Sequence, residues 1–218
     1  MIQTIPANQV TLRTLKKQFG LQLSQDEQFF PEWRQADARL SDTEDEILER
    51  VKDNFLALME DPPLLENTVK MVVLAPLLDL AGFYRQPFRI ETEPSVTLEM
   101  EDEGMVIQGR INVLVQKHRL WLLVIESKRS DFAVSRAIPQ ALAYMLGNGD
   151  REALQMQDRT SPTFGMITNG NEFLFLKATR NPAVRYANSR LFSLLNPEPE
   201  LGSVLQSLKH LGEVAVGD

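Results

Sequence analysis

Residues 121–128 read Trp-Leu-Leu-Val-Ile-Glu-Ser-Lys, and this stretch decides the fold class that the sequence predicts. Its first five residues are apolar without interruption, which is typical of a central β-strand covered on both faces. Glu126 and Lys128 follow with a spacing of two, so both side chains are expected on one face, about 6.6 Å apart along the strand. A buried strand therefore ends in a carboxylate and an ammonium group.

The chain up to residue 83 is predicted to contain three helices. One helix is expected at 11–18, and a second, with a Ser/Asp cap and one apolar stripe, at 41–59. The stretch 64–83 is apolar on nearly all sides, which predicts a buried helix that Pro76 kinks near Val72.

Around and after the strand, alternating residues and turn signals predict a mixed sheet with one crossover helix. The expected elements are a hairpin of strands 88–98 and 105–116, a helix at 133–146, a hairpin of strands 163–168 and 172–177, and a last helix at 199–212. We therefore predict an α/β or α+β fold with helices flanking a mixed central sheet. An N-terminal helical extension, 1–40, is expected to pack on a single domain, 41–218.

The composition excludes several kinds of site. The chain has no cysteine, which rules out disulfides, thiolate metal sites and a cysteine nucleophile. Its two histidines, His118 and His210, are too few for a histidine-rich zinc site. Any metal is expected on carboxylate oxygens, which suits Mg²⁺, Mn²⁺ or Ca²⁺. The sequence has no long apolar run and no recognisable secretory leader, so we expect a cytoplasmic protein without a membrane segment.

Charge is divided unevenly along the chain, whose net charge is −7. Residues 1–104 hold 10 Lys and Arg against 20 Asp and Glu, residues 105–190 hold 12 against 6, and residues 191–218 hold 1 against 4. The basic excess falls on the segment that contains Glu126 and Lys128. This distribution is compatible with a phosphate-facing surface on an otherwise acidic protein.

The Glu126–Lys128 pair has two interpretations. A carboxylate beside a buried strand needs a compensating charge, which the lysine or a divalent cation can supply. In phosphodiester hydrolysis the carboxylate would fix the metal, and the lysine would activate water or stabilise the phosphate. The same residues also fit a strand that simply reaches solvent, where charged residues begin.

Four further polar residues are expected near this pair. Asn112 lies on the polar face of the neighbouring strand, and Glu66 opens the buried helix, where the helix dipole alone would also favour a carboxylate. Gln140 and Tyr144 are four residues apart and share one face of the crossover helix. Taken singly, the last two also fit a surface amide and a tyrosine at the edge of the core.

Several stretches together resemble a known family. They are ENTVK at 66–70, PLLDLAGF at 76–83, GRINVLV at 109–115, VIESK at 124–128, PQALAY at 139–144 and TNG at 168–170. The chain resembles the N-terminal nuclease domain of type I restriction enzyme R subunits, within the PD-(D/E)XK superfamily, as a stand-alone member without the helicase. The resemblance covers residues 42–178 and implies a restriction-endonuclease-like core.

The resemblance also implies residue roles at a Mg²⁺ or Mn²⁺ site. Glu126 corresponds to a metal ligand, Lys128 to the catalytic lysine, and Glu66 to an auxiliary acidic ligand. Gln140 belongs to the same catalytic group. Asn112 stands where the family has its first aspartate, so it retains an oxygen donor for catalysis and metal binding but lacks one negative charge.

DNA is the partner that the resemblance implies, and a homo-oligomer or restriction-type partner subunits are further expectations. The DNA contacts are expected from Arg110, Arg129, Arg136, Tyr144 and Asn169. A basic rim around the site is expected to include the three arginines and Lys128, with some of Lys177, Arg180, Arg185 and Arg190.

Three functions fit these observations. The first is a Mg²⁺-dependent DNA endonuclease, weakened by Asn112. The second is a catalytically inactive module that uses the same fold to bind DNA or a protein partner, since a fold does not determine a function. The third is a structural protein in which Glu-Ser-Lys is only a surface edge, which the acidic net charge would suit.

Overall fold

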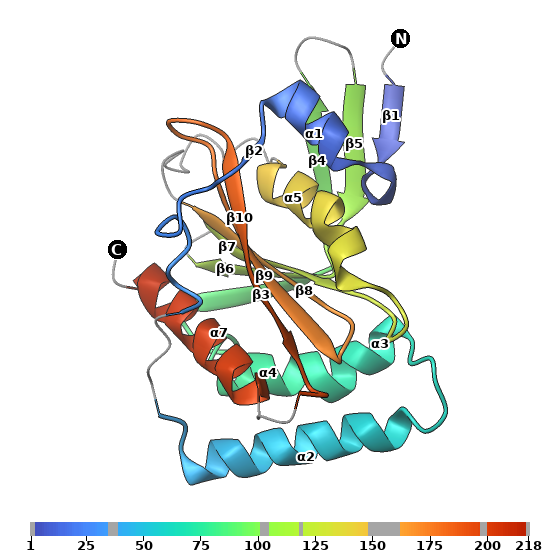
Figure 1. Ribbon diagram of the computed structural model, residues 1–218, viewed down its shortest axis with the longest axis vertical. Helices are drawn as coiled ribbons and strands as arrows, with labels where there is room; N and C mark the ends of the chain where they lie inside the picture. Colours follow the sequence, from blue (N-terminus) through green and yellow to red (C-terminus); the bar gives the residue numbers. More distant parts are fainter. Residues whose placement is uncertain are drawn as a thin grey trace.

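The computed structural model describes residues 3–34, 39–100, 105–117, 120–147, 162–196 and 200–216. Their strands form two sheets (Figure 1). The larger sheet has the order β2 (Gln22–Leu23), β10 (Arg185–Ser193), β9 (Glu172–Thr179), β8 (Thr163–Thr168), β7 (Leu120–Ser127), β6 (Val113–Lys117) and β3 (Phe88–Thr92). The smaller sheet has the order β1 (Gln3–Pro6), β5 (Met105–Arg110) and β4 (Ser95–Met100).

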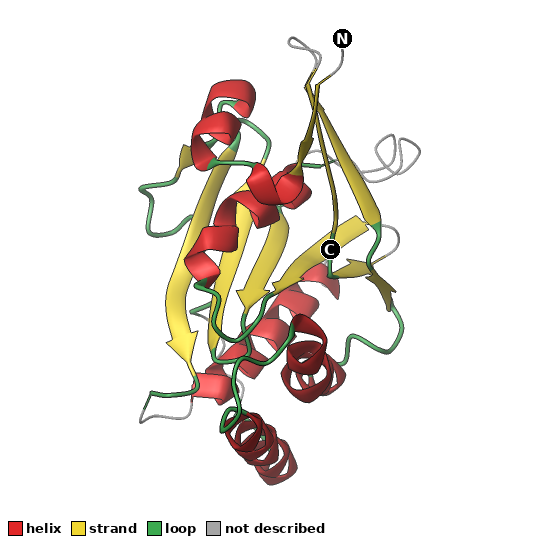
Figure 2. Ribbon diagram, turned by 90° about the vertical axis from the view of Figure 1, so that its right-hand side faces the viewer, coloured by secondary structure: helices red, strands yellow, loops and turns green. Residues whose placement is uncertain are grey.

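Helices cover both faces of the larger sheet (Figure 2), which confirms the predicted α+β class. The helices are α1 (Leu12–Phe19), α2 (Asp42–Leu58), α3 (Glu66–Val69), α4 (Ala75–Leu80), α5 (Ile138–Leu146) and α7 (Glu200–Val216). Short turns are η1 (Ala7–Gln9), η2 (Lys70–Leu74) and η3 (Val134–Ala137). No helix in these described ranges is both long and apolar enough to cross a membrane.

Each face of the larger sheet has its own hydrophobic core. Strand residues such as Phe173 and Phe175 pack with α2, α4 and α7 on one face. Their neighbours Leu174 and Leu176 pack with α1 and α5 on the other. Because alternate side chains of a strand point to opposite faces, β9 contributes to both cores. This double burial is the reason that the sequence of β9 is almost continuously apolar.

The strand β7 has the internal position that its apolar sequence predicts, between β6 and β8. It runs parallel to β8, and α5 lies in the crossover connection between them. The predicted hairpin after α5 is confirmed as β8 and β9, with β9 extending to Thr179. These elements bring the charged end of β7 next to α5.

The predicted hairpin of 88–98 and 105–116 is one ribbon that bends between the two sheets. Its pairing keeps a constant register from Phe88↔Lys117 to Met100↔Met105. At the bend, Glu93 has a φ of 55° and the Ile111 N–H bonds to the carbonyl of Pro94. The single straight strand predicted over 105–116 is therefore wrong, because the bend sends its two halves into different sheets. The predicted turn at 101–104 lies outside the described residues.

The buried helix predicted at 64–83 is regular only at its two ends. It starts at Glu66, and η2 is a π-helical turn in which the Ala75 N–H bonds to the carbonyl of Lys70. Pro76 follows directly and has no N–H to donate to the preceding turn. The distortion predicted near Val72 thus takes the form of a widened turn over Lys70–Leu74.

Three strands were not predicted, because their pairing depends on distant segments. The parallel partners of β1 and β2 are β5 and β10, so the described N-terminal residues join both sheets. The third is β10, which pairs with β9 but has a register shift between Asn188 and Leu191. That irregularity interrupts the alternation by which a strand is recognised. The predicted last helix, 199–212, is α7 and continues to Val216.

Candidate active site

The charged end of β7 forms the centre of the candidate site. Glu126 is only 1% exposed, and its Oε1 accepts hydrogen bonds from Lys128 Nζ (2.6 Å) and Gln140 Nε2 (2.8 Å). Its second oxygen, Oε2, is buried and finds no hydrogen-bond partner within the described part of the chain. Oε1 therefore has two hydrogen-bond donors, whereas Oε2 has none among the described residues.

Gln140 connects the end of β7 to α5. Its Oε1 accepts from Lys128 Nζ at 3.1 Å, and its Nε2 also donates to the hydroxyl of Tyr144 at 2.9 Å. Gln140 and Tyr144 are on one face of α5, as their spacing predicts. The amide therefore holds the lysine, the carboxylate and the tyrosine in one hydrogen-bonded chain.

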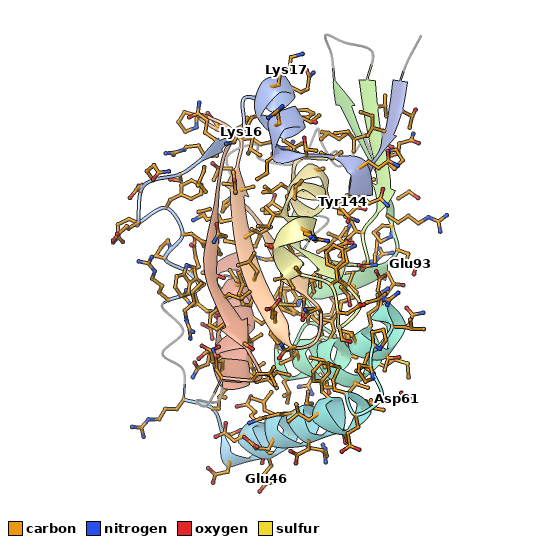
Figure 3. The ribbon with its side chains drawn as sticks, turned by 45° about the vertical axis from the view of Figure 1, so that its right-hand side comes forward. Lys16, Lys17, Glu46, Asp61, Glu93 and Tyr144 are labelled. Carbon is orange, nitrogen blue, oxygen red and sulfur yellow. The ribbon has the colours of Figure 1, made fainter. Side chains whose placement is uncertain are left out.

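Tyr144 joins this chain to the smaller sheet (Figure 3). Its ring packs on the backbone of Gly109, where a Cβ atom would lie 2.6 Å from the hydroxyl oxygen and 2.7 Å from ring atom Cε1. The hydroxyl also bonds to the backbone of Arg110, and burial raises the pKa of Tyr144 to about 12. Glycine at 109 is required for this close approach.

Asn112 approaches the site from the bend of the ribbon. Its Oδ1 accepts a hydrogen bond from the backbone N–H of Ser127 at 2.8 Å. The β6–β7 ladder ends just before, at Val113↔Ile125. The amide oxygen thus takes the place of a main-chain carbonyl beyond the bend. The atom that the resemblance assigns to a metal is engaged with the main chain in this structure.

The loop after β7 positions Glu66. The Leu64 N–H donates to Ser130 Oγ (2.8 Å), and the Ser130 N–H donates to the Leu64 carbonyl (3.1 Å). This two-way contact ties the start of α3 to the end of β7. As a result, the charge of Glu66 is one of those that act on Glu126.

The environment of Glu126 raises its pKa from 4.5 to about 7. Burial is the largest cause, because it disfavours the charged form. The charge and hydrogen bond of Lys128 lower the pKa, Glu66 raises it, and Lys70 lowers it. Burial outweighs the nearby ammonium groups, so the carboxylate is under-compensated at neutral pH.

This shift makes a prediction for stability. In the unfolded chain Glu126 loses its proton near pH 4.5, whereas the folded protein keeps that proton until about pH 7. The free energy of unfolding therefore falls as pH rises through this window. Between pH 4.5 and 8, in the presence of a chelator, the wild type is expected to lose about 3 kcal/mol more than Glu126→Gln. Urea unfolding at several pH values measures this difference. If the free energies of unfolding of the two proteins changed in parallel with pH, the prediction would be contradicted.

The donor set fits a hard divalent cation. Glu126 Oε2 is a buried oxygen without a partner in the described part of the chain, and Glu66 offers a second carboxylate. Mg²⁺ is commonly bound by one or two carboxylates and otherwise by water and substrate phosphates. Within the described ranges, however, no group of three His, Cys, Asp or Glu side chains gathers at one point.

The residues assigned to DNA contacts fall into two groups. Arg110, Arg129 and Arg136 are exposed, and Arg129 also pairs with Asp131 at 3.0 Å. In contrast, Tyr144 is 3% exposed and Asn169 is 4% exposed, so both are used inside the protein. The Oδ1 of Asn169 accepts from two backbone N–H groups of its own turn, and its Nδ2 donates to the carbonyl of Phe132. Asn169 thus supports the loop that carries Lys128.

The four basic residues expected to add to the rim lie on or beside β9 and β10, which β8 separates from β7. Lys177 forms an ion pair with Glu32, and Arg190 forms one with Glu200. Lys177 also contacts the ring of Phe164, which belongs to the core on the α4 and α7 side. The side chains of Lys177 and Arg190 are therefore used to hold other segments on the sheet rather than at the site.

Three residues of the site were not singled out by the sequence analysis. Gly109 admits the ring of Tyr144, Ser130 ties the β7 loop to α3, and Lys70 acts electrostatically on Glu126. Only Lys70 has a sequence signal, its spacing of four from Glu66. The other two depend on contacts between segments that are far apart in the chain.

The fold and site define a mixed α+β protein with a buried carboxylate, a lysine and an amide at the end of an internal strand. Neither models of protein families nor curated proteins match the chain. Among solved structures, it is similar to "a putative HsdR subunit of a type I restriction enzyme from Vibrio vulnificus YJ016", a fragment structure. The identity is 22%, the TM-score is 0.37, and the match covers 53% of this chain and 21% of that chain. This likeness is too distant to carry an argument about function.

Proposed function

We propose that this chain is a metal-dependent DNA endonuclease that hydrolyses phosphodiester bonds. The observation that supports the proposal best is Glu126, whose Oε1 is held by Lys128 and Gln140 while its buried Oε2 has no partner in the described ranges. Leaving a buried acceptor unpaired is costly, so such an atom requires an explanation, for example a catalytic role or a bound ion. A divalent cation at Oε2 would supply the compensation that is missing.

Glu126 and Glu66 would hold the Mg²⁺ or Mn²⁺ ion, which when bound would polarise the scissile phosphate. Two N–H groups of Lys128 are used by Glu126 and Gln140, so among the described residues a third remains to donate to water or to a phosphate oxygen. Gln140 fixes the direction of that ammonium group. The chain's own residues thus orient a donor beside an anionic pocket.

DNA would reach this pocket across the exposed side chains of Arg110, Arg129 and Arg136. Arginine binds phosphate through two parallel N–H groups, and each phosphate contact releases counterions from DNA. The logarithm of the DNA affinity should therefore fall linearly with the logarithm of the salt concentration.

One observation favours a second function, a catalytically inactive module that binds DNA or a protein partner. Asn112 carries no charge, and its one side-chain oxygen already accepts a hydrogen bond from the N–H of Ser127. A site with fewer anionic ligands binds Mg²⁺ less well, because this ion sheds its water reluctantly.

Calorimetric titration with Mn²⁺, followed by a plasmid cleavage assay, separates the two functions. For the endonuclease we expect metal binding and nicking in the wild type, and neither in Glu126→Ala. Lys128→Met should keep metal binding and lose nicking by roughly 100-fold or more, as for removal of a group that stabilises the transition state. Glu46→Ala is the matched control, because Glu46 lies on α2 at a distance from the site (Figure 3) and should leave both unchanged. Metal binding absent from the wild type would favour the inactive module.

A further inference from the structure

Lys70 is a charged residue of the site that the proposed chemistry does not use. It is the first residue of the π-helical turn η2 and lies one helical turn after Glu66, so the two side chains share a face. Its side chain is 19% exposed, and Nζ lies 3.9 Å from Glu93 Oε1. π-helical turns inside α-helices are frequent at functional sites.

Three carboxylates from separate segments are associated with this lysine, one by helix spacing, one by an ion pair and one by charge. Glu66 precedes it on α3, and Glu93 reaches it from the bend of the ribbon. Glu126 at the end of β7 is the third, since the charge of Lys70 is among those that act on it.

The bend itself is shaped to bring Glu93 to this place. Its φ of 55° is unusual for a residue other than glycine, and its N–H bonds to the carbonyl of Asn112 at 3.3 Å. Figure 3 shows Glu93 below Tyr144 and on the same side of the molecule. The ion pair with Lys70 therefore connects the bend to the helix that carries Glu66.

We propose that Lys70 is a built-in counter-ion of the site, which offsets part of the charge of its carboxylates and competes with a divalent cation for them. The inference rests on the proposed function, because it concerns the same pocket. Two positive charges in one pocket repel each other, and the repulsion is strong where water is largely excluded. An ion that binds at Glu126 Oε2 must therefore overcome the field of Lys70 or displace its ammonium group.

Lys128 does not have this role. Its ammonium is held on the other oxygen of Glu126 and by Gln140, whereas Oε2 has no such partner in the described ranges. Lys70 adds one positive charge to the pocket, and Asn112 lacks the negative charge that an aspartate would carry. Both residues therefore make the pocket less negative. Metal binding is thus set by competition between an internal and an external cation.

Mn²⁺ affinity, measured by calorimetry, tests the competition. We expect Lys70→Met to bind Mn²⁺ about tenfold more tightly than the wild type, as expected for loss of one nearby like charge. Its melting temperature should rise more on addition of Mn²⁺. Lys70→Arg keeps the charge and should bind Mn²⁺ as the wild type does. Lys16→Met is the control for net charge, because Lys16 is on α1, far from Glu93 (Figure 3).

The possible results lead to different conclusions. Unchanged or weaker Mn²⁺ binding by Lys70→Met, in a variant that melts cooperatively, overturns the counter-ion proposal. If Lys70→Met does not fold, Lys70→Arg decides. Tighter Mn²⁺ binding by Lys70→Arg than by the wild type overturns the proposal, and Mn²⁺ binding with wild-type affinity supports it. Weaker DNA binding with unchanged Mn²⁺ affinity would make Lys70 a phosphate contact instead.

If no variant binds Mn²⁺, this proposal and the endonuclease both fail. If Lys70→Met binds tightly but cleaves no DNA, only the endonuclease fails.

Discussion

Asn112→Asp is expected to tighten Mn²⁺ binding by on the order of 100-fold, about 3 kcal/mol, because it adds an anionic oxygen beside Glu126. An aspartate can still accept the N–H of Ser127 with one oxygen, as Asn112 does at 2.8 Å. Its second oxygen would then be available to a cation. The side-chain volume hardly changes, so the packing around the bend should be preserved. Calorimetry with Mn²⁺ and the rate of plasmid nicking measure the gain.

Stability provides an independent test of the same substitution. Without metal, the new carboxylate would repel Glu126, so the melting temperature of Asn112→Asp should be slightly below that of the wild type. Saturating Mg²⁺ or Mn²⁺ should reverse the order, because ligand binding stabilises the folded state. Glu126→Ala in the Asn112→Asp background should abolish both the metal response and the nicking. An Asn112→Asp protein that binds no metal would identify the chain as a non-catalytic relative.

Gly170→Ala is expected to lower the free energy of unfolding by about 3 kcal/mol or more, the combined cost of backbone strain and overpacking. Gly170 lies in the turn between β8 and β9 with a φ of 90°. A Cβ atom there would be 2.5 Å from Cε2 of Phe55, which is 1% exposed. Phe55 belongs to α2, the outermost helix in Figure 1, so the clash would push this helix away from the sheet. Chemical unfolding measures the loss.

Gly82→Ala is the matched control for this prediction. Gly82 has a φ of 80°, but a Cβ atom there would have no neighbour within 4 Å among the described residues. This substitution therefore carries the backbone strain alone, which costs roughly 1–2 kcal/mol. Equal losses for the two variants would show that the contact between the turn and Phe55 contributes nothing to stability.

Asn112→Asp and Lys70→Met both make the pocket more negative, so together they test how much negative charge a cation site needs. The pocket combines an under-compensated Glu126 with a lysine at 70 and an amide at 112. Asn112→Asp and Lys70→Met each make the pocket more negative by one charge. If their effects on Mn²⁺ affinity are additive, the two groups act independently, whereas a shortfall would indicate that they interact through the same ion.

The sequence by itself determined the elements whose patterns are local. The apolar run before Glu126 predicted an internal strand, and the spacing of two placed Lys128 on the same face, where the two side chains form a hydrogen bond. The spacing of four likewise placed Gln140 beside Tyr144 on one helix face. These relations follow from the geometry of a single strand or helix, so they need no knowledge of the rest of the fold.

Only the tertiary structure decided how these elements meet. The ribbon bends at Glu93 and Asn112, which engages the amide oxygen with Ser127 and brings Glu93 to Lys70. Each of these contacts joins residues more than ten positions apart, and nothing in either local sequence specifies the partner. The burial of Glu126, which raises its pKa, also arises only when α5 closes over the end of β7. Periodicity determines which way a side chain points, but packing between distant segments determines what it contacts.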